Sequence, residues 1–412
     1  MPALILAALL QATAPAAQTL VVSPAGPFAT VGAAVAVARP GAVIEVRAGR
    51  YREPTITIER PVTLQGEPGA VLDGEGTHAI LVVHADHVTI RGLDFTNTGM
   101  AYKDDRAALR IADASDCQVT GNRFDATFFA VYLASVRDCL ISDNVIAGVT
   151  TRESAMGNGI HLWSSRYVVV RGNQVTGHRD GIYLEFTRHA DVRDNVSEGN
   201  VRYGMHFMYS DSSDYTHNTF RSNGSGVAVM YTNAVTMTGN TFASNRGAAA
   251  YGLLLKEIQD ARLVGNTFRG NTVGLLADGA DRAVVTGNEF NDNVWALRML
   301  SSTISGRVTG NAFRRNSFDV AVNGNGNTAV FSGNWWDGYH GWDLDHDGIG
   351  DVAYHPVRLF ALLVERAQPA LLLQRSLFVK MLDAAERALP VLTPTAVADL
   401  QPLMHPPAGG SR

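Results

Sequence analysis

The sequence has little of three features that would assign it to a class at once. Its 412 residues include only two cysteines, too few for a fold held together by disulfide bonds. Its 34 basic and 39 acidic residues give a formal net charge of −5, without the basic stripe that is typical of a nucleic-acid-binding protein. No apolar run approaches the ~20 residues that cross a bilayer. The chain is long enough for a large buried core, and its 40 glycines, spread along the sequence, indicate many tight turns.

The N-terminal stretch "MPALILAALLQATAPAAQ" is typical of a secretory signal. Ala3 to Leu10 form a short apolar run, and Ala14-Pro15-Ala16 supplies the small-x-small pattern of a cleavage site. The stretch before the run has no Lys or Arg, which leaves an N-terminal helix of a cytosolic protein as the alternative. We predict a signal peptide over residues 1–16 and a mature protein outside the cytoplasm.

A short motif, Asn-x-Phe-x-x-Asn, recurs through the middle of the chain. Full copies begin at Asn218, Asn240, Asn266, Asn288 and Asn311. Weaker copies begin at Asn122, Asn144, Asn173 and Asn195, and "NWW" at Asn334 closes the series. Successive first asparagines lie 22 to 29 residues apart, most often 22 or 23. This period, with short β-branched runs and Asn/Gly turns, indicates one coil of a parallel β-helix per repeat.

The repeat therefore predicts an all-β fold class, a right-handed parallel β-helix with coils of about 22 residues. We expect ten to twelve coils between residues 20 and 335. An asparagine at the same turn of each coil would stack its amide into a hydrogen-bonded ladder. The segment from Val31 to Glu53 is typical of a short helix, a Pro-Gly break and a strand, and it resembles the cap that covers the first coil. Leucine-rich repeats have a similar length, but their Leu-x-x-Leu-x-Leu pattern is missing.

The strand after each second asparagine can be aligned on a glycine. Residues one and three positions after this glycine are uniformly apolar, so alternation along a strand predicts that they face the interior. They are Ile160, Ile182, Met205, Val227, Leu253 and Leu275, then Leu162, Leu184, Phe207, Val229, Leu255 and Ala277. The residues predicted to face outward are His161, Tyr183, His206 and Ala228, with Trp163, Glu185, Met208, Met230 and Lys256 beside them.

The outward set contains a histidine and two methionines on one surface, His206, Met208 and Met230. Neighbouring coils stack at about 4.8 Å, so we expect Met208 directly above Met230, with His206 two residues away along the strand. Thioether and imidazole are soft ligands that suit Cu(I), and we predict a copper site with these three ligands, which His161 or Glu185 would complete or orient. One alternative is ordinary surface exposure. The other is an aromatic platform for a sugar ring, built from Trp163, Tyr183, Tyr209 and Tyr231.

The two cysteines follow the same register. Cys117 and Cys139 each lie five residues before a repeat asparagine, so they are expected to stack in adjacent coils. The equivalent positions of other coils hold small apolar residues, namely Val168, Ala190, Val235 and Ala261. We expect buried, stacked thiols; a disulfide in an oxidising compartment is the first alternative, and copper ligation is the second.

An acidic and aromatic segment, residues 336–356, follows the last coil. Its "DLDHDGIGD" places Asp343, Asp345 and Asp347 at alternate positions and Asp351 at the ninth, as in the first part of an EF-hand calcium loop. Tyr354 stands at the twelfth position, where the loop requires a bidentate Glu, so a complete EF-hand is excluded. We predict a turn clamped by calcium through the four aspartates; the alternative is an acidic surface loop.

The last segment, residues 357–405, has the pattern of two amphipathic helices broken near Pro369. Leu, Phe and Val gather on one side, with Arg, Glu and Lys between them. Such an apolar face must pack on the β-helix, on a partner or on a membrane surface. We predict that it is a docking segment with no cover beyond the last coil.

Several stretches carry a resemblance to a known family: "GMHFMYSD", "YGLLLKEI", "WALR", "FSGNWWDGYHGWDLDHDGIGDVAYHPVRLF" and the closing helices. Together they resemble the NosD family, periplasmic maturation factors for the copper sites of nitrous oxide reductase. The resemblance implies a periplasmic accessory protein that is not an enzyme. Its implied partners are an ABC transporter permease and ATPase, a membrane-anchored copper chaperone and nitrous oxide reductase, to which copper passes transiently as Cu(I). The terminal helices would dock on the permease, so that the protein meets the membrane through that partner.

The rival class is an enzyme, a polysaccharide lyase or hydrolase on the same fold. Such a site needs two closely placed acids, or calcium-binding carboxylates with a basic residue. The coils offer Asp180, Glu185, Asp191 and Asp194, but the pattern places no pair of aspartates on an outward strand face, and Asp104-Asp105 falls in a predicted loop. The sequence therefore favours the accessory protein over the enzyme. It also disfavours a purely structural β-helix, which would leave the amphipathic helices without a role.

Overall fold

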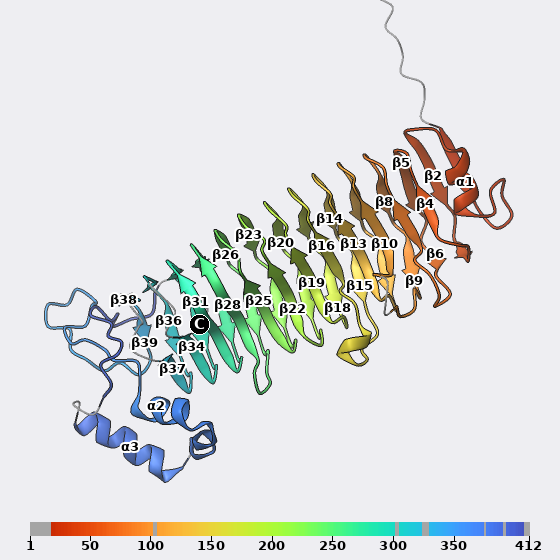
Figure 1. Ribbon diagram of the computed structural model, residues 1–412. Coiled ribbons are helices and arrows are strands. Elements are labelled where there is room, and N and C mark those ends of the chain that lie inside the picture. The colour runs from red at the N-terminus through yellow and green to blue at the C-terminus, as the bar shows by residue number, and fades with distance from the viewer. Residues whose placement is uncertain are drawn as a thin grey trace, which may run out of the picture.

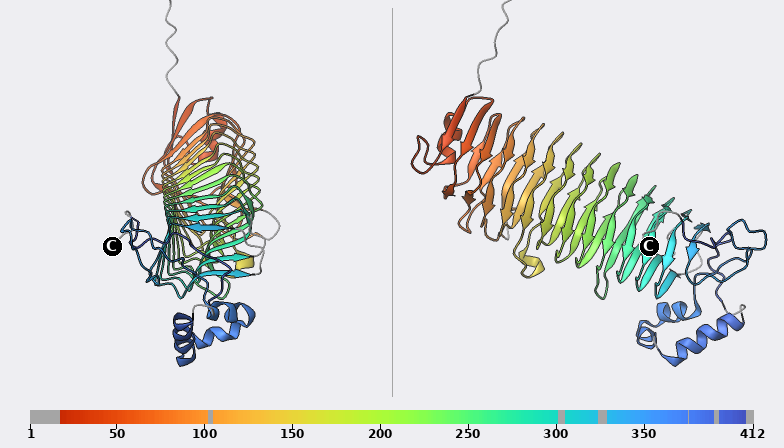
Figure 2. Two further views of the ribbon diagram at one scale, coloured as in Figure 1. Left: turned by 90° about the vertical axis from the view of Figure 1, so that its left-hand side faces the viewer. Right: turned by 180° about the vertical axis from the view of Figure 1, so that it is seen from behind.

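The chain forms a rod of stacked coils in the computed structural model, which describes residues 18–101, 105–300, 305–323, 329–374, 376–389 and 393–407 (Figure 1). The predicted signal peptide and Asp104 lie outside these residues. Three parallel sheets run along the rod, which confirms the predicted parallel β-helix (Figure 2). The described sheets hold 14, 13 and 12 strands, so the rod has about 13 coils rather than ten to twelve. The earliest coils carry no repeat asparagine, and the sequence pattern therefore undercounts them.

Each coil contributes one strand to each of three sheets, which we number 1 to 3. Sheet 1 consists of β1 (Thr19–Val22), β2 (Ala42–Val46), β5 (Val62–Gly66), β8 (Thr89–Arg91), β11 (Gln118–Thr120), β14 (Leu140–Ser142), β17 (Val169–Arg171), β20 (Asp191–Arg193), β23 (Ser213–Thr216), β26 (Val235–Thr238), β29 (Arg262–Val264), β32 (Val284–Thr286), β35 (Arg307–Thr309) and β38 (Val330–Ser332). Sheet 2 consists of β3 (Gly49–Tyr51), β6 (Ala70–Asp73), β9 (Asp94–Thr96), β12 (Arg123–Asp125), β15 (Val145–Ala147), β18 (Gln174–Thr176), β21 (Val196–Glu198), β24 (Thr219–Arg221), β27 (Thr241–Ala243), β30 (Thr267–Arg269), β33 (Glu289–Asn291), β36 (Ala312–Arg314) and β39 (Trp335–Trp336). Sheet 3 consists of β4 (Ile56–Ile58), β7 (Leu81–Val83), β10 (Ala107–Ala112), β13 (Phe129–Ala134), β16 (Ile160–Trp163), β19 (Asp180–Glu185), β22 (Tyr203–Met208), β25 (Ser225–Met230), β28 (Tyr251–Gln259), β31 (Val273–Asp281), β34 (Trp295–Leu300) and β37 (Phe318–Asn323).

The repeat motif builds the interior of the rod in columns. The asparagine column is confirmed: the side-chain amides of Asn218, Asn240 and Asn266 each donate to the next asparagine at 2.9–3.0 Å. The second asparagines of the motif form a parallel ladder of the same kind, for example from Asn245 to Asn271 at 3.0 Å. The motif phenylalanines stack inside the rod as a third column, Phe220, Phe242, Phe268, Phe290 and Phe313, which ends on Trp336. These columns satisfy the buried polar groups at each turn and remove apolar area from water.

The first coil is closed by the predicted helical cap, α1 (Val31–Val37). Thr30 accepts a hydrogen bond from the backbone N–H of Ala33 at 3.2 Å and so caps the N-terminus of the helix. Val31, Ala34 and Val35 turn into the core. The cap covers apolar residues that a next coil would otherwise bury.

The other end of the chain forms α2 (Leu359–Arg366), the 3-10 helix η2 (Gln368–Leu373) and α3 (Leu377–Ala388), close to the predicted pair broken at Pro369. Figures 1 and 2 show α2 and α3 beside the last coils rather than beyond them. Phe360, Ala361 and Val364 are buried against the outer face of sheet 3. The segment was expected to have no cover beyond the last coil. Helix α2 packs on β37 of that coil but also reaches earlier coils, where Glu365 pairs with Arg298 of β34, so the cover is wider than expected.

Residues 393–407 return to the end of the rod and close it. Asp399 takes the next place in the asparagine column, since its carboxylate accepts from the backbone N–H of Asn334 at 3.0 Å and from its side-chain amide at 2.9 Å. The same carboxylate accepts from the indole of Trp336 at 3.1 Å, at the end of the aromatic column. This closing segment belongs to the folded rod, so removal of the whole C-terminal region would expose the last coil.

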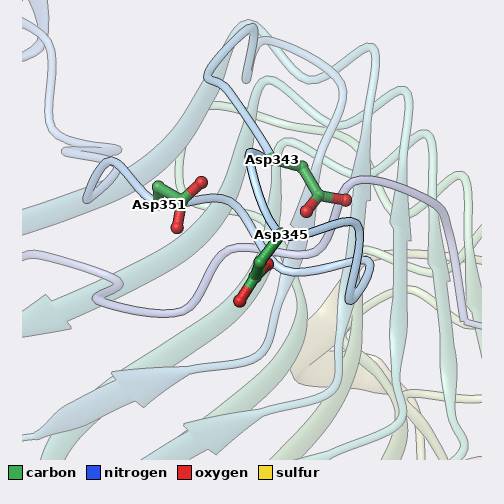
Figure 3. A group of neighbouring side chains, drawn as sticks. All are labelled: Asp343, Asp345 and Asp351. Carbon is green, nitrogen blue, oxygen red and sulfur yellow. The ribbon is translucent and has the colours of Figure 1, made fainter.

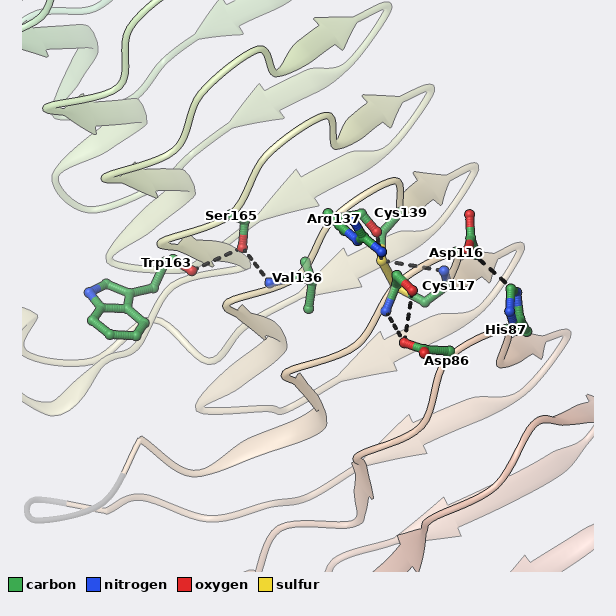
Figure 4. The surroundings of a disulfide bond; sticks show 10 residues. Asp86, His87, Asp116, Cys117, Val136, Arg137, Cys139, Trp163 and Ser165 are labelled. Carbon is green, nitrogen blue, oxygen red and sulfur yellow. Dashed lines mark hydrogen bonds and ion pairs between the residues drawn. A yellow bond between two sulfur atoms is a disulfide. The ribbon is translucent and has the colours of Figure 1, made fainter.

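Cys117 and Cys139 stack in adjacent coils as predicted, and they form a disulfide rather than two thiols (Figure 4). Their Cα atoms are 4.5 Å apart, which is the spacing of neighbouring strands and within the range that a disulfide spans. The expectation of stacked thiols was therefore wrong, and the disulfide ties two adjacent coils together.

Candidate functional site

The outer face of sheet 3 carries the predicted copper ligands in the expected register. Met208 on β22 is the strand partner of Met230 on β25, and Glu185 is the partner of Met208 on the other side. His206 lies two residues before Met208 on β22, and its register partners on the neighbouring strands are Tyr183 and Ala228. Both methionines are partly exposed. The predicted inward residues, including Met205, are buried.

His206 faces outward from the sheet but is not open to solvent, with 6% of its surface exposed. Tyr183 covers one side of the ring edge-on at 5.1 Å between centroids, and Tyr203 lies at 4.9 Å. The expectation of a freely exposed imidazole was therefore wrong, because the large aromatic residues of its own and the preceding coil close over it. Its Nε2 atom is buried and has no hydrogen-bond partner among the described residues.

An ion pair that the sequence pattern did not predict lies beside His206, between the buried Asp180 and the partly exposed Arg202. Arg202 donates from Nε to Asp180 at 2.8 Å and forms a second contact through Nη2. Burial alone would raise the pKa of Asp180, but the neighbouring His206 and Arg202 lower it, so the carboxylate stays charged. The available signal was the charged Asp180 at a strand position where other coils place Ser225 or Val273.

The contacts of Nδ1 bear on the tautomer of His206. Nδ1 lies 3.3 Å from Nη2 of Arg202, and a guanidinium only donates, so this contact suits the tautomer with the proton on Nε2. Coordination of a metal through Nε2 requires the other tautomer, with the proton on Nδ1. Asp180 lies 3.9 Å from Nδ1 and provides the carboxylate that commonly orients a metal-binding imidazole.

Tyr183 connects the methionine pair to the rest of the site. Its hydroxyl donates to Glu185 at 3.2 Å and lies 3.9 Å from the sulfur of Met208. His161 is the strand partner of Tyr183, two coils from His206, so the structure does not bring the two imidazoles together. Burial, with a contribution from Arg179, lowers the pKa of His161 to about 3, and the ring is neutral at physiological pH.

The donor set of this face fits monovalent copper. Two thioethers from adjacent coils are soft, neutral donors, and so is Nε2 of His206 in the tautomer with the proton on Nδ1; Cu(I) is the common biological metal that prefers such donors. Met208 and Met230 lie at the surface, so an ion held by them would stay accessible to a second protein. The assignment of these three residues as ligands stays a prediction.

The acidic loop brings three of the four predicted calcium ligands together (Figure 3). Ligand oxygens of Asp343, Asp345 and Asp351 lie within 4.8 Å of one another. Asp347 is not in this group; its carboxylate accepts from the backbone N–H of Ile349 at 2.7 Å. Asp343 also accepts from Gly348, whose φ of +85° suits glycine at the turn. Calcium at this loop stays a prediction, now with three carboxylates.

One acidic pair contradicts the expectation that no two aspartates share an outward strand face. Asp191 on β20 is the register partner of Asp214 on β23 in sheet 1. Asp191 forms an ion pair with Arg193. The alignment of the sheet 3 strands did not cover this sheet, which is why the pair was missed.

In the part of the chain that the structure describes, no helix is both long and apolar enough to span a membrane. Two solved structures share the fold. PfbA, a surface adhesin of Streptococcus pneumoniae, has a TM-score of 0.52 at 10% identity, covering 74% of this chain and 85% of its own. DFA-IIIase from Arthrobacter chlorophenolicus A6 has a TM-score of 0.51 at 15% identity, covering 77% and 94%. At such identities the likeness shows the fold alone.

Sequence relatives are more specific. A family model described as "Periplasmic copper-binding protein (NosD)" matches residues 148–341. A Pseudomonas aeruginosa protein described as "Probable ABC transporter binding protein NosD" is 32% identical, covering 96% of this chain and 99% of that protein. A Stutzerimonas stutzeri protein of the same description is 31% identical, covering 87% and 86%. With such relatives matched over nearly their whole length, the chain belongs to the NosD family of periplasmic copper-binding proteins.

Proposed function

We propose that this protein holds Cu(I) transiently on the outer face of sheet 3 and delivers it for the maturation of the copper sites of nitrous oxide reductase. The observation that carries the proposal is the register pairing of Met208 with Met230, two residues along the strand from His206, whose buried Nε2 has no hydrogen-bond partner among the described residues. Family membership supports copper as the cargo. The relatives' description as ABC transporter binding proteins supports a transporter as a partner.

The chemistry of delivery follows from the donor types. Thioethers are weak, uncharged donors that hold Cu(I) without a closed four-ligand cage, so a partner with thiolate or imidazole donors takes the ion readily. A shift of the His206 proton from Nε2 to Nδ1, toward Asp180, adds the imidazole nitrogen as a third donor. The copper would arrive from a membrane-anchored copper chaperone. The permease and ATPase of the ABC transporter would bind the helical segment at the end of the rod.

The test replaces the thioethers without disturbing packing. Met208→Leu with Met230→Leu conserves volume and removes both sulfurs, and His206→Gln keeps a polar side chain beneath Tyr183. We expect Cu(I) affinity, measured by competition with a chromophoric chelator, to fall at least about tenfold in the double variant, and further in the triple variant. The copper content of a reductase matured in its presence should fall with it.

The matched control is Met100→Leu, which changes an exposed methionine outside the strands of sheet 3. This control should bind Cu(I) like the unchanged protein. Full Cu(I) binding by the triple variant, with an unchanged circular dichroism spectrum, would refute the assignment of the ligands. Normal maturation of the reductase by a variant that no longer binds copper would refute the delivery function.

A further inference from the structure

A surface of arginines and aromatic rings lies on the corner where sheet 3 turns into sheet 1. Arg137, Arg166 and Arg188 are bridge partners in three adjacent coils. Aromatic rings flank this arginine column on both sides. Tyr167 and His189 stack on one side, and Phe186, Tyr209 and Tyr231 stack on the other, with centroids 5.0–5.3 Å apart. We call these eight residues the corner surface.

The fold itself gains little from this arrangement. Tyr167 and Phe186 are 53% and 50% exposed, so much of their apolar area stays in water. Like charges on directly neighbouring strands repel one another. Arg188 has an ion-pair partner only at the edge of contact distance, with Asp211 at 4.0 Å. A local arrangement that costs stability without a folding benefit indicates a role in binding.

The corner surface contains a hollow of about 340 Å³. Ser164 occupies the position next to Phe186 in the aromatic column, and its small side chain leaves one face of the ring open. Arg166 and Arg188 line the same hollow. A guanidinium binds a carboxylate through two parallel hydrogen bonds, and an open ring face stacks on another ring or an apolar side chain. The hollow therefore fits an acidic group beside an apolar one.

The corner surface adjoins the methionine pair. Tyr209 directly follows Met208 in the chain, and Tyr231 directly follows Met230. A molecule seated on the corner surface would therefore lie next to the residues proposed to hold copper. Arg137 to Tyr231 extends over five coils, about 19 Å at the strand spacing, which is the scale of a protein interface. Arginine, tyrosine and methionine are also the residues enriched at the centres of such interfaces.

We propose that the corner surface docks the copper chaperone that delivers Cu(I) to Met208 and Met230, and that this partner presents an acidic surface with an apolar side chain for the hollow. The inference rests on the proposed copper function. Charge complementarity sets the orientation of the encounter and places the partner's donor atoms beside the thioethers.

The experiment compares two copper donors. Cu(I) is transferred to the full chain either from the Cu(I)-loaded soluble domain of the copper chaperone or from a Cu(I)–bicinchoninate complex, at low and high salt. The variant is Arg166→Glu with Arg188→Glu. The control is Arg123→Glu with Arg171→Glu, an equal change of charge at exposed positions in sheets 2 and 1.

We expect the Arg166/Arg188 variant to accept copper from the chaperone about tenfold or more slowly at low salt, with a weaker dependence on salt, and from bicinchoninate at the normal rate. The control variant should behave like the unchanged protein with both donors. Equal rates for all three proteins, or equal slowing in the control, would overturn the inference. Binding of an oligogalacturonate to the Arg166/Arg188 variant is measured as a check for an acidic-sugar site. If this variant loses oligogalacturonate binding but accepts copper from the chaperone at the normal rate, the corner surface binds an acidic sugar and the inference is overturned. Failure of the unchanged protein to take copper from bicinchoninate would refute the copper function itself, and the inference with it.

Discussion

The outer face of sheet 3 has two halves that differ in what lies over them. In the coils from β16 to β25, one row along the sheet reads His161, Tyr183, His206 and Ala228, with Glu185, Met208 and Met230 beside it. In the coils from β28 to β37 the same row continues with Leu254, Leu276, Arg298 and Ala321. Helix α2 packs on this second half through Phe360 and Val364.

The difference shows that the strand positions do not determine chemistry by themselves. Both halves have the same backbone, spacing and register, and both bury the inward row completely. The covered half is mostly apolar because α2 removes it from water, and its Arg298 pairs with Glu365 of that helix at 2.8 Å. The open half holds histidine, methionine and a charged pair, which give no comparable burial energy. Polar and soft side chains kept at regular positions on a fold that accepts leucine there indicate binding rather than stability.

The largest expected effect comes from weakening the packing of α2 on sheet 3. Phe360 is 2% exposed and its ring lies 5.8 Å from that of Phe318, so Phe360→Ala should leave a cavity and cost about 3–5 kcal/mol at the helix–sheet contact. Limited proteolysis should then release the helical segment. Phe378→Ala, at a half-exposed phenylalanine of α3, is the matched control and should change little. Equal protease resistance of the Phe360 and Phe378 variants would mean that α2 does not depend on this contact.

The second prediction concerns the pH dependence of the unfolding free energy, and it compares two buried aspartates, one in each half of sheet 3. Arg202 keeps Asp180 charged, whereas burial raises the pKa of Asp319 to about 7, with Asn316 donating to it at 3.3 Å. An acid whose pKa is higher in the folded than in the unfolded chain favours folding at low pH, and this contribution is lost as pH rises from about 4 to 7.

In the unchanged protein, the unfolding free energy should therefore fall by at most about 1.4 kcal/mol per pH unit between about pH 4 and pH 7 because of Asp319. Asp319→Asn should abolish this fall. Denaturant unfolding at pH 5 and pH 8 measures it, with Asp214→Asn, an exposed aspartate, as the control. Asp337 and Arg358 also act on Asp319, in opposite directions, so a variant at either position should shift the midpoint of the effect. An identical pH dependence in the unchanged protein and the Asp319 variant would show that the carboxyl is already ionised at pH 5.

The periodic features were predictable from the sequence because one rule repeats in every coil. The asparagine column, the inward rows and the pairing of Met208 with Met230 all follow from a constant period and strand alternation. The state of Cys117 and Cys139 was not predictable in the same way. Register brings the two sulfurs together but leaves thiol and disulfide equally compatible with the pattern.

Contacts that do not repeat from coil to coil could not be predicted from the sequence period. The burial of His206 depends on how Tyr183 and Tyr203 orient, which a row of letters does not contain. The packing of α2 on sheet 3 depends on how the chain turns after the last coil. Asp399 completes the asparagine column from more than sixty residues away, and no spacing rule links it to Asn334. Such long-range contacts follow from shape complementarity rather than periodicity.

The smallest effect on folding is expected at the solvent-exposed side of α3. This side lies away from sheet 3, and we expect a partner to bind there. Leu377, Phe378 and Met381 of α3 are 73%, 52% and 64% exposed, and apolar patches of this kind usually mark a binding surface.

Because residues 393–407 close the rod, substitution is a cleaner test than truncation. Gln at all three positions should change the unfolding free energy by no more than about 0.5 kcal/mol, since these side chains are already in water. It should abolish co-purification with the ABC transporter permease and ATPase. Lys380→Gln with Ala384→Gln, at exposed positions of the same helix, is the control and should leave the association intact. If the triple variant still binds the transporter, α3 only shields the outer face of sheet 3, and the open half becomes the remaining candidate for contact with the membrane complex.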